Sequence, residues 1–123
     1  MPRILTADKL REVKVCKKQI DLFVELFGEQ VEVTPELCEK HALDFDFYFA
    51  ANYLCNKEEF YSFLYIYSIA FEKYDNITDD AWKKYYTKKQ YTRDEYFDIK
   101  KRAKVERMKT IARTFAVIYN SEA

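Results

Sequence analysis

Glycine and proline are scarce in this chain of 123 residues, which contains one glycine and two prolines. β-Hairpins and barrels need many tight turns with positive φ, and this chain has very few of the residues that form them. The composition therefore argues against β-rich folds and favours helices joined by short links. A single glycine also excludes a glycine-rich phosphate loop, and with it nucleotide hydrolysis of the P-loop kind.

Cysteine is sparse and follows no pattern. Cys16, Cys38 and Cys55 are odd in number and contain no C-x-x-C pair, which argues against a disulfide framework and a zinc ribbon. The chain has no run of about 18 uncharged apolar residues, and its first residues lack the basic, apolar and small-residue order of a secretion signal. We therefore expect a cytoplasmic protein that does not enter a membrane.

Apolar residues, by contrast, make up 49% of the chain and charged residues 34%, which is typical of a sequence that folds. The length suits one domain over residues 1–123. Because the apolar residues recur at steps of three and four, the pattern indicates α-helix. We predict an all-α fold, a single-domain bundle of five or six helices around a central aromatic-rich helix.

Capping residues give the predicted helix boundaries. The first helix is expected over residues 7–27, with Gly28 as its stop. Residues 31–33 are extended in character but too short for an independent strand. The third helix is expected to run to about Cys55, and the last helix to end near Asn120. The predicted starts are Thr6, Thr34 with Pro35, Asp44 or Asp46, Asn56 with Glu59, Thr78, and Thr92 with Glu95.

Aromatic residues are concentrated in one segment, with twelve Phe and Tyr residues between Phe45 and Tyr74. A helix that is apolar nearly all round is typical of the centre of a bundle, so we expect residues 59–74 there. The segment holds more rings than a small bundle hides. Some tyrosines are therefore predicted to face outward as contacts for a protein partner, and Tyr61 and Tyr65 are the candidates.

Charge is balanced overall but divided along the chain. Residues 1–18 carry a net charge of +4, residues 19–80 of −11 and residues 81–123 of +7. The last predicted helix is the most basic, and its spacing places several cations on one face. This face is interpreted as a solvated surface paired with the acidic middle of the chain, as a phosphate contact or as a contact for an acidic protein. The candidate partner-binding cations are Lys100, Lys101, Lys104 and Arg107.

Catalytic and metal sites find little support in the sequence. Cys38 and His41 stand three residues apart, with Asp44 and Asp46 close behind, but a closed zinc site needs four ligands and no second pair exists. His41 is also the one conventional base for a nucleophilic cysteine. We expect a packed cysteine and a hydrogen-bonded histidine instead, and we predict no catalytic residue, no metal and no cofactor.

Several short segments lie within residues 16–55 of the N-terminal half: Cys16-Lys17-Lys18-Gln19, Leu26-Phe27-Gly28, Val31-Glu32-Val33-Thr34, Cys38 to Asp46 and Ala50-Ala51. In these segments the chain resembles a group of small uncharacterised phage-encoded proteins. Two later segments, Ala81-Trp82-Lys83-Lys84-Tyr85 and Thr114-Phe115-Ala116, look like single remnants of elements found later in that group. The resemblance implies a viral or prophage origin and no established activity.

Together these features favour a non-enzymatic protein that binds and inhibits a host factor in the cytoplasm of the host cell. A bacterial defence system such as CRISPR-Cas is one such target, which would make the chain anti-CRISPR-like. The alternative is a nucleic-acid-associated protein that uses the basic C-terminal helix. Expected partners are a host protein or protein complex, with nucleic acid and a second copy of the chain left open.

Overall fold

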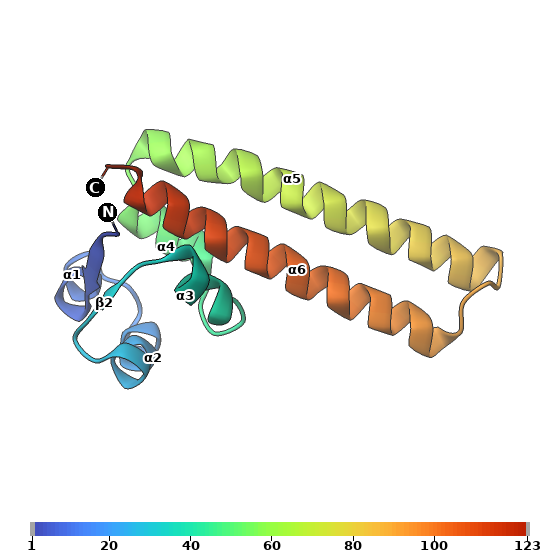
Figure 1. Cartoon of the computed structure of the whole chain (residues 1–123), viewed down its shortest axis with the longest axis horizontal. Coiled ribbons are helices and arrows are strands. Elements are labelled where there is room, and N and C mark those ends of the chain that lie inside the picture. The colour runs from blue at the N-terminus through green and yellow to red at the C-terminus, as the bar shows by residue number, and fades with distance from the viewer. Residues whose placement is uncertain (1, 123) are drawn as a thin grey trace.

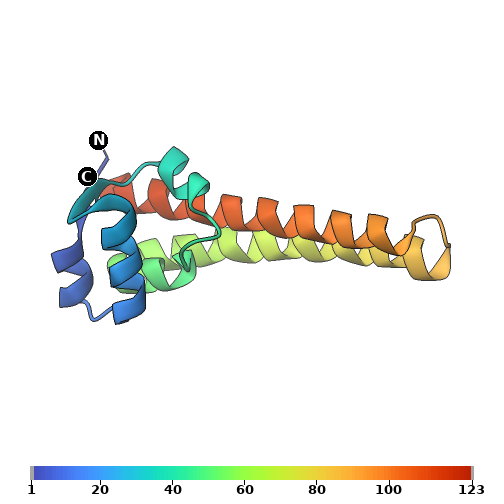
Figure 2. The ribbon, with the colours of Figure 1, turned by 90° about the horizontal axis from the view of Figure 1, so that it is seen from below.

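A computed structural model of the chain describes residues 2–122. Two long antiparallel helices, α5 (Lys57–Trp82) and α6 (Arg93–Tyr119), form a hairpin, and short elements gather at one end of it (Figures 1 and 2). We call these short elements the head. They are β1 (Ile4–Thr6), α1 (Ala7–Glu12), α2 (Lys17–Phe27), β2 (Gln30–Glu32), α3 (Pro35–Lys40) and α4 (Phe47–Leu54). The predicted all-α class is confirmed.

A small two-stranded sheet lies in the head. β1 and β2 pair antiparallel, with Leu5 opposite Val31 at the centre of the register. Residues 31–33 were expected to be extended but too short to form a strand alone. The sequence pattern did not predict that this segment pairs with residues 4–6. Leu5 and Val33 are buried, so the sheet contributes to the core as well as joining two parts of the head.

The single helix predicted over residues 7–27 is wrong, because the chain breaks into α1 and α2. Lys14 adopts a positive φ of 61°, and its N–H donates to the Arg11 carbonyl at 3.1 Å. The Val15 N–H donates to the Leu10 carbonyl at 3.1 Å. This pair of bonds is the Schellman arrangement that ends a helix, normally around glycine. A lysine in the left-handed position gave no sequence signal of the stop.

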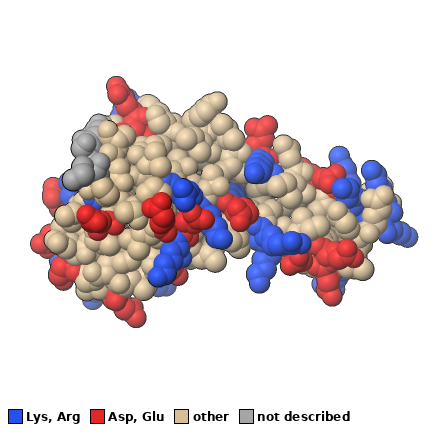
Figure 3. Space-filling model, in the orientation of Figure 1, with Lys and Arg blue, Asp and Glu red and all other residues tan. Residues whose placement is uncertain are grey.

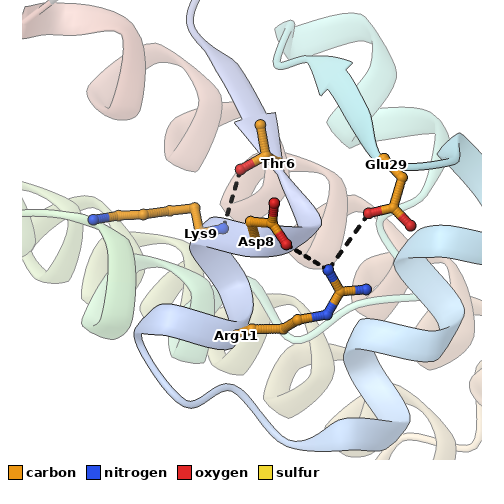
Figure 4. A network of polar contacts seen from close by, with 5 residues as sticks. All are labelled: Thr6, Asp8, Lys9, Arg11 and Glu29. Atoms are coloured by element: carbon orange, nitrogen blue, oxygen red, sulfur yellow. Dashed lines mark hydrogen bonds and ion pairs between the residues drawn. The ribbon is translucent and has the colours of Figure 1, made fainter.

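Polar contacts fix α1 against the rest of the head (Figure 4). The Thr6 hydroxyl accepts a hydrogen bond from the Lys9 N–H at 3.0 Å, as the predicted cap. Arg11 donates from Nη1 to Asp8 at 2.7 Å and to Glu29 at 3.5 Å, so it joins α1 to the residue before β2. Because these charges are exposed, each ion pair stabilises the fold only modestly.

The helix predicted to start at Thr78 is also wrong, because α5 continues through this residue to Trp82. The Thr78 hydroxyl donates to the carbonyls of Tyr74 and Asp75, at 3.0 and 3.3 Å. It therefore bonds backward within the helix instead of capping a new one. A threonine followed by two aspartates is typical of a helix cap, but here the threonine hydroxyl bonds to the carbonyls of the preceding turn instead.

The other predicted helix boundaries agree with the structure. Gly28 ends α2 with a φ of 76°, and α4 ends at Leu54, directly before Cys55. α6 ends directly before Asn120. The confirmed caps are Thr34 with Pro35 for α3, Asp46 for α4, the capping box of Asn56 and Glu59 for α5, and the capping box of Thr92 and Glu95 for α6.

The core lies where the head meets the base of the hairpin. Phe63 of α5 is fully buried, and the rings of Phe47 and Phe115 lie 5.7 Å apart between α4 and α6. Ala112 and Ala116 of α6 are fully buried, and such small residues let helices approach closely. Apolar burial at this junction therefore holds the hairpin and the head together.

Both ends of the described chain are joined beside this core (Figure 1). The Arg3 N–H donates to the Asn120 side chain at 2.8 Å, and the Asn120 amide donates to the Val33 carbonyl at 2.8 Å. The Arg3 guanidinium also lies 4.2 Å from the centre of the Tyr119 ring. One asparagine thus links the residues around β1 and β2 to the end of α6.

Burial of α5 is one-sided. Its rings Phe60, Phe63 and Tyr67 contact one another and Tyr48 of α4, whereas Tyr65 is 68% exposed. The aromatic-rich helix is part of the bundle, as predicted, but burial on nearly every side does not occur. The expectation that some tyrosines reach the surface agrees with this arrangement.

The one-sided burial predicts very different costs for two neighbouring rings. Phe63→Ala is expected to lower the free energy of unfolding by about 3–5 kcal/mol, because it leaves a cavity in the core. Tyr65→Ala, on the solvent side of the same helix, should change it by less than about 0.5 kcal/mol. Denaturant unfolding followed by circular dichroism measures both. Equal costs would show that α5 is not buried on one side.

Lys14 provides a second stability test. Lys14→Gly should raise the free energy of unfolding by roughly 0.5–1 kcal/mol, because glycine has no Cβ to penalise the left-handed conformation. Lys14→Ala is the matched control and should give no gain, since alanine keeps the Cβ. A loss of stability in the glycine variant, measured by the same unfolding titration, would contradict the observed helix end.

Candidate interaction surfaces

The far end of the hairpin lies well away from the head (Figures 1 and 2). We call residues 82–97 the tip. A π-helical turn over Lys83–Thr87 continues α5, and the chain then reverses through Lys89, which has a positive φ of 53°. The Gln90 N–H donates to the Lys84 carbonyl at 2.6 Å, so the reversal is closed by backbone hydrogen bonds. The capping box at Thr92 then starts α6.

Stacked rings organise the tip. Trp82 and Tyr86 lie parallel with centroids 5.2 Å apart, and Tyr85 and Tyr96 stack at 5.5 Å. Trp82 also meets Tyr96 edge-on at 5.4 Å, which joins α5 to α6. Although Tyr96 is buried, Trp82 and Tyr86 remain 45% and 67% exposed. The rings therefore fix the shape of the tip and at the same time present an aromatic surface.

Positive charge surrounds these rings. Residues 81–93 contain no Asp or Glu, and in Figure 3 many Lys and Arg side chains lie at this end of the molecule, beside Asp and Glu side chains from the flanking residues. Lys84 is paired with Asp80 at 3.1 Å, and the Arg93 guanidinium lies 5.4 Å from the centre of the Phe97 ring. No ion pair is found for Lys88 or Lys89 within residues 2–122. The tip is therefore an aromatic surface with a basic rim.

Sequence reasoning did not identify the tip as a site. The signal was present, because residues 81–93 combine five cations and four aromatic rings without an acidic residue. Their significance depends on their position at the end of a projecting hairpin. We assigned part of this segment to a separate helix, which concealed that position.

The four predicted cations on α6 fall into two environments. Lys100, Lys101 and Lys104 are exposed, and none of them forms an ion pair among the described residues. Arg107 instead stacks on α5, with its guanidinium 4.2 Å from the centre of the Phe71 ring. It lies 4.3 Å from Tyr74 in the same way, and its Nε has no hydrogen-bond partner in the described part of the chain. The structure thus groups the three lysines and places Arg107 between the helices.

The two predicted tyrosines lie on the outer side of α5. Tyr61 is 57% exposed and Tyr65 is 68% exposed, and the Lys57 ammonium lies 5.9 Å from the centre of the Tyr61 ring. Both belong to the half of α5 near the head, whereas the lysines of α6 lie nearer the tip. The predicted tyrosines and cations therefore do not form one continuous site.

An open groove runs between α5 and α6. Its apolar lining comes from Ile66, Ile69 and Ile77 of α5 and from Ile99, Ala103 and Thr110 of α6. The groove encloses about 490 Å³, and the three isoleucines of α5 are each more than a third exposed. It continues toward the head past Thr114 and Val117. An uncovered apolar groove of this kind is typical of an interaction surface.

His41 and Cys38 have the surroundings of a hydrogen-bonded histidine and a packed cysteine. The His41 ring is hydrogen-bonded to Asp44 at 2.7 Å, which agrees with the predicted role of this histidine. Burial raises the pKa of the Cys38 thiol to about 12. Cys38 lines an apolar cavity of about 260 Å³ in the head, and Cys16 lies at the same cavity. Within residues 2–122, no cluster of three His, Cys, Asp or Glu side chains could hold a metal ion.

Among residues 2–122, no helix combines the length and apolar character that crossing a lipid bilayer requires.

Comparison of the chain with protein-family models, with curated proteins and with solved structures finds no match.

The position of Cys38 predicts how its thiol responds to pH. With a pKa of about 12, only about one thiol in ten thousand is ionised at pH 8, so a thiol reagent should leave Cys38 unmodified in the folded protein. Cys16 is exposed and should react rapidly. Mass spectrometry of the labelled peptides measures both, with a urea-unfolded sample as the control in which both react. Rapid labelling of Cys38 in the folded protein would contradict its burial.

Proposed function

We propose that this chain is a non-enzymatic binding protein whose hairpin tip docks onto an acidic surface of another protein. The observation that carries this proposal is the exposed stack of Trp82 and Tyr86 beside residues 81–93, which contain five cations and no acidic residue. A fold that needed these rings for stability alone would bury them more completely. Their exposure at the end of a projecting hairpin supports a role in contact.

Such a tip has the properties of a binding hot spot. Trp and Tyr are over-represented among the residues that dominate binding energy, and a ring already held in place loses little freedom on binding. Tyr96 and Tyr85 hold Trp82 from the inner side, so its exposed face is oriented before a partner arrives. The surrounding lysines favour a partner with acidic residues around an apolar centre, because opposite charges guide the encounter.

The resemblance of residues 16–55 to phage-encoded proteins extends the proposal to a host setting. There the partner is a host protein or complex in the cytoplasm, and occupation of its surface is the inhibitory act. A component of a bacterial defence system such as CRISPR-Cas fits this role. No catalysis is required, because inhibition then follows from competition for a surface.

A nucleic-acid partner is the second candidate. The unpaired Lys100, Lys101 and Lys104 favour it, since they provide cations along α6 in addition to the tip, and exposed rings can stack on unpaired bases. A continuous phosphate backbone would meet Asp94 and Glu95 of the tip, whereas a folded protein surface can place its acidic residues opposite the lysines alone. We therefore place the protein partner first.

The proposal is tested with a ring and a cation removed together from the tip. The double variant Tyr86→Ala, Lys88→Glu should bind the partner at least roughly tenfold more weakly, because it removes an exposed ring and reverses a rim charge. The partner is first isolated by affinity capture from infected host cells on the immobilised wild-type chain. Its dissociation constant is then measured with purified partner by calorimetry.

A matched control exists at the other end of α5. Lys57→Glu with Tyr61→Ala removes another ring and lysine that lie together, and it should leave affinity unchanged. Loss of binding in this control alone would assign the contact to Lys57 and Tyr61 and would overturn the tip proposal. Titration with single-stranded and duplex DNA at low and high salt tests the second candidate. Tight, steeply salt-dependent binding lost on Lys100→Glu with Lys104→Glu would favour nucleic acid.

A further inference from the structure

The open groove between α5 and α6 is separate from the tip and has no partner within the described chain. One side of the hairpin is covered by α3 and α4 at its base, while the groove side presents Ile66, Ile69 and Ile77 to solvent. Two antiparallel helices with an exposed apolar seam are half of a four-helix bundle. The groove therefore has the form of one half of an interface.

The register of the two helices shows which residues lie at the same level along the groove. Glu59 meets Ser121 through a hydrogen bond of 3.4 Å, and Trp82 meets Tyr96 through their rings. Between these two contacts the helices run antiparallel, so each step forward along α5 corresponds to one step backward along α6. Lys73 of α5 therefore lies level with Glu106 of α6.

By the same register, Ile69 lies level with Thr110, and Ile77 lies level with Arg102, next to Ala103. At the first of these levels a large side chain of α5 lies across from a small one of α6; at the second, Arg102, which is paired with Asp98 at 2.6 Å, lines the groove beside Ala103. Lys73 and Glu106 lie at the level between them. Both are exposed, and they form no ion pair with each other in the described chain.

From this pattern we infer that the groove binds a second copy of the same chain, across a two-fold axis that runs along the groove. This symmetry lays α5 of each copy on α6 of the other, at matching levels. Ile69 of each copy then packs against Thr110 of the other, and Ile77 packs against Ala103 and the aliphatic stem of Arg102. Lys73 of each copy faces Glu106 of the other, so two ion pairs form across the interface.

The other face-to-face symmetry lacks this complementarity. A two-fold axis that crosses the helices at the level of Lys73 lays α5 on α5 and brings the Lys73 charges of the two copies face to face, which is unfavourable. The α5 side of the groove complements the α6 side, and a second copy of the chain presents both sides at the same spacing. The charge pattern therefore selects a second copy, in the parallel arrangement.

The size of the groove sets the strength of the dimer. The groove lining spans residues 66–77 of α5 and 99–118 of α6, a face roughly 25 Å long and 20 Å wide. About 500 Å² per copy would be buried, or about 1,000 Å² in total, which is at the lower end of specific interfaces. We therefore expect a weak, reversible dimer.

Charge reversal at the two groove positions tests the arrangement. Lys73→Glu alone or Glu106→Lys alone turns both ion pairs into like-charge contacts, so each variant should dimerise roughly tenfold more weakly or worse. An equimolar mixture of the two variants restores opposite charges in both contacts and should form a heterodimer. The chain carrying both substitutions should dimerise like the wild type. Sedimentation equilibrium over a range of concentrations measures each mass.

Lys104→Glu is the matched control, since this cation of α6 does not line the groove and its reversal should leave the dimer unchanged. Circular dichroism checks that each single variant is folded. The inference is overturned if the wild type remains monomeric at millimolar concentration, or if both single variants dimerise as well as the wild type. It is also overturned if the folded variants fail to associate when mixed. Binding at the tip is measured separately, so either proposal can fail alone.

Discussion

The architecture depends on a mismatch of length between the hairpin and the elements that cover it. α5 and α6 contain 26 and 27 residues, which corresponds to roughly 40 Å each, whereas α4 contains eight residues and spans about 12 Å. The core around Phe63 and Phe115 can therefore form only at the base. Beyond it, each long helix has the other as its packing partner, and every other side faces solvent. Both proposed contact surfaces lie on this uncovered part of the hairpin.

The uncovered part is held together by contacts other than a deep apolar core. Arg107 lies against Phe71 and Tyr74, where its aliphatic stem and guanidinium fill the space between the helices. Ala70, Ala81 and Ala103 are buried there, and the small residues allow the helices to approach. At the end, the stack of Tyr85 on Tyr96 closes the pair. These contacts stabilise an antiparallel pair without covering its outer faces, which is why exposed rings and isoleucines remain.

The capping residues that begin and end helices could be predicted from the sequence. Which faces of the long helices are covered by other elements could not. Capping boxes such as Asn56 with Glu59 predicted helix starts because the bonding groups are adjacent in the chain. Thr78 and Lys14 misled the prediction because each uses a less common local option: a backward hydroxyl bond and a left-handed lysine. The outward position of Tyr61 and Tyr65 was anticipated from an excess of rings. The tip and the groove were not, because an apolar residue looks the same in sequence whether another helix covers it or not.

The two surfaces are connected by geometry. A two-fold axis along the groove is parallel to the hairpin, so it carries each tip to a position beside the other at the same end of the dimer. Two tips that point the same way can engage a partner with two equivalent sites, and the second contact then forms at a high effective concentration. A two-fold axis across the helices would point the tips in opposite directions and remove this gain. A partner with two sites would itself hold the two copies together. In the side-by-side arrangement, a weak dimer is therefore enough for both tips to bind the same partner.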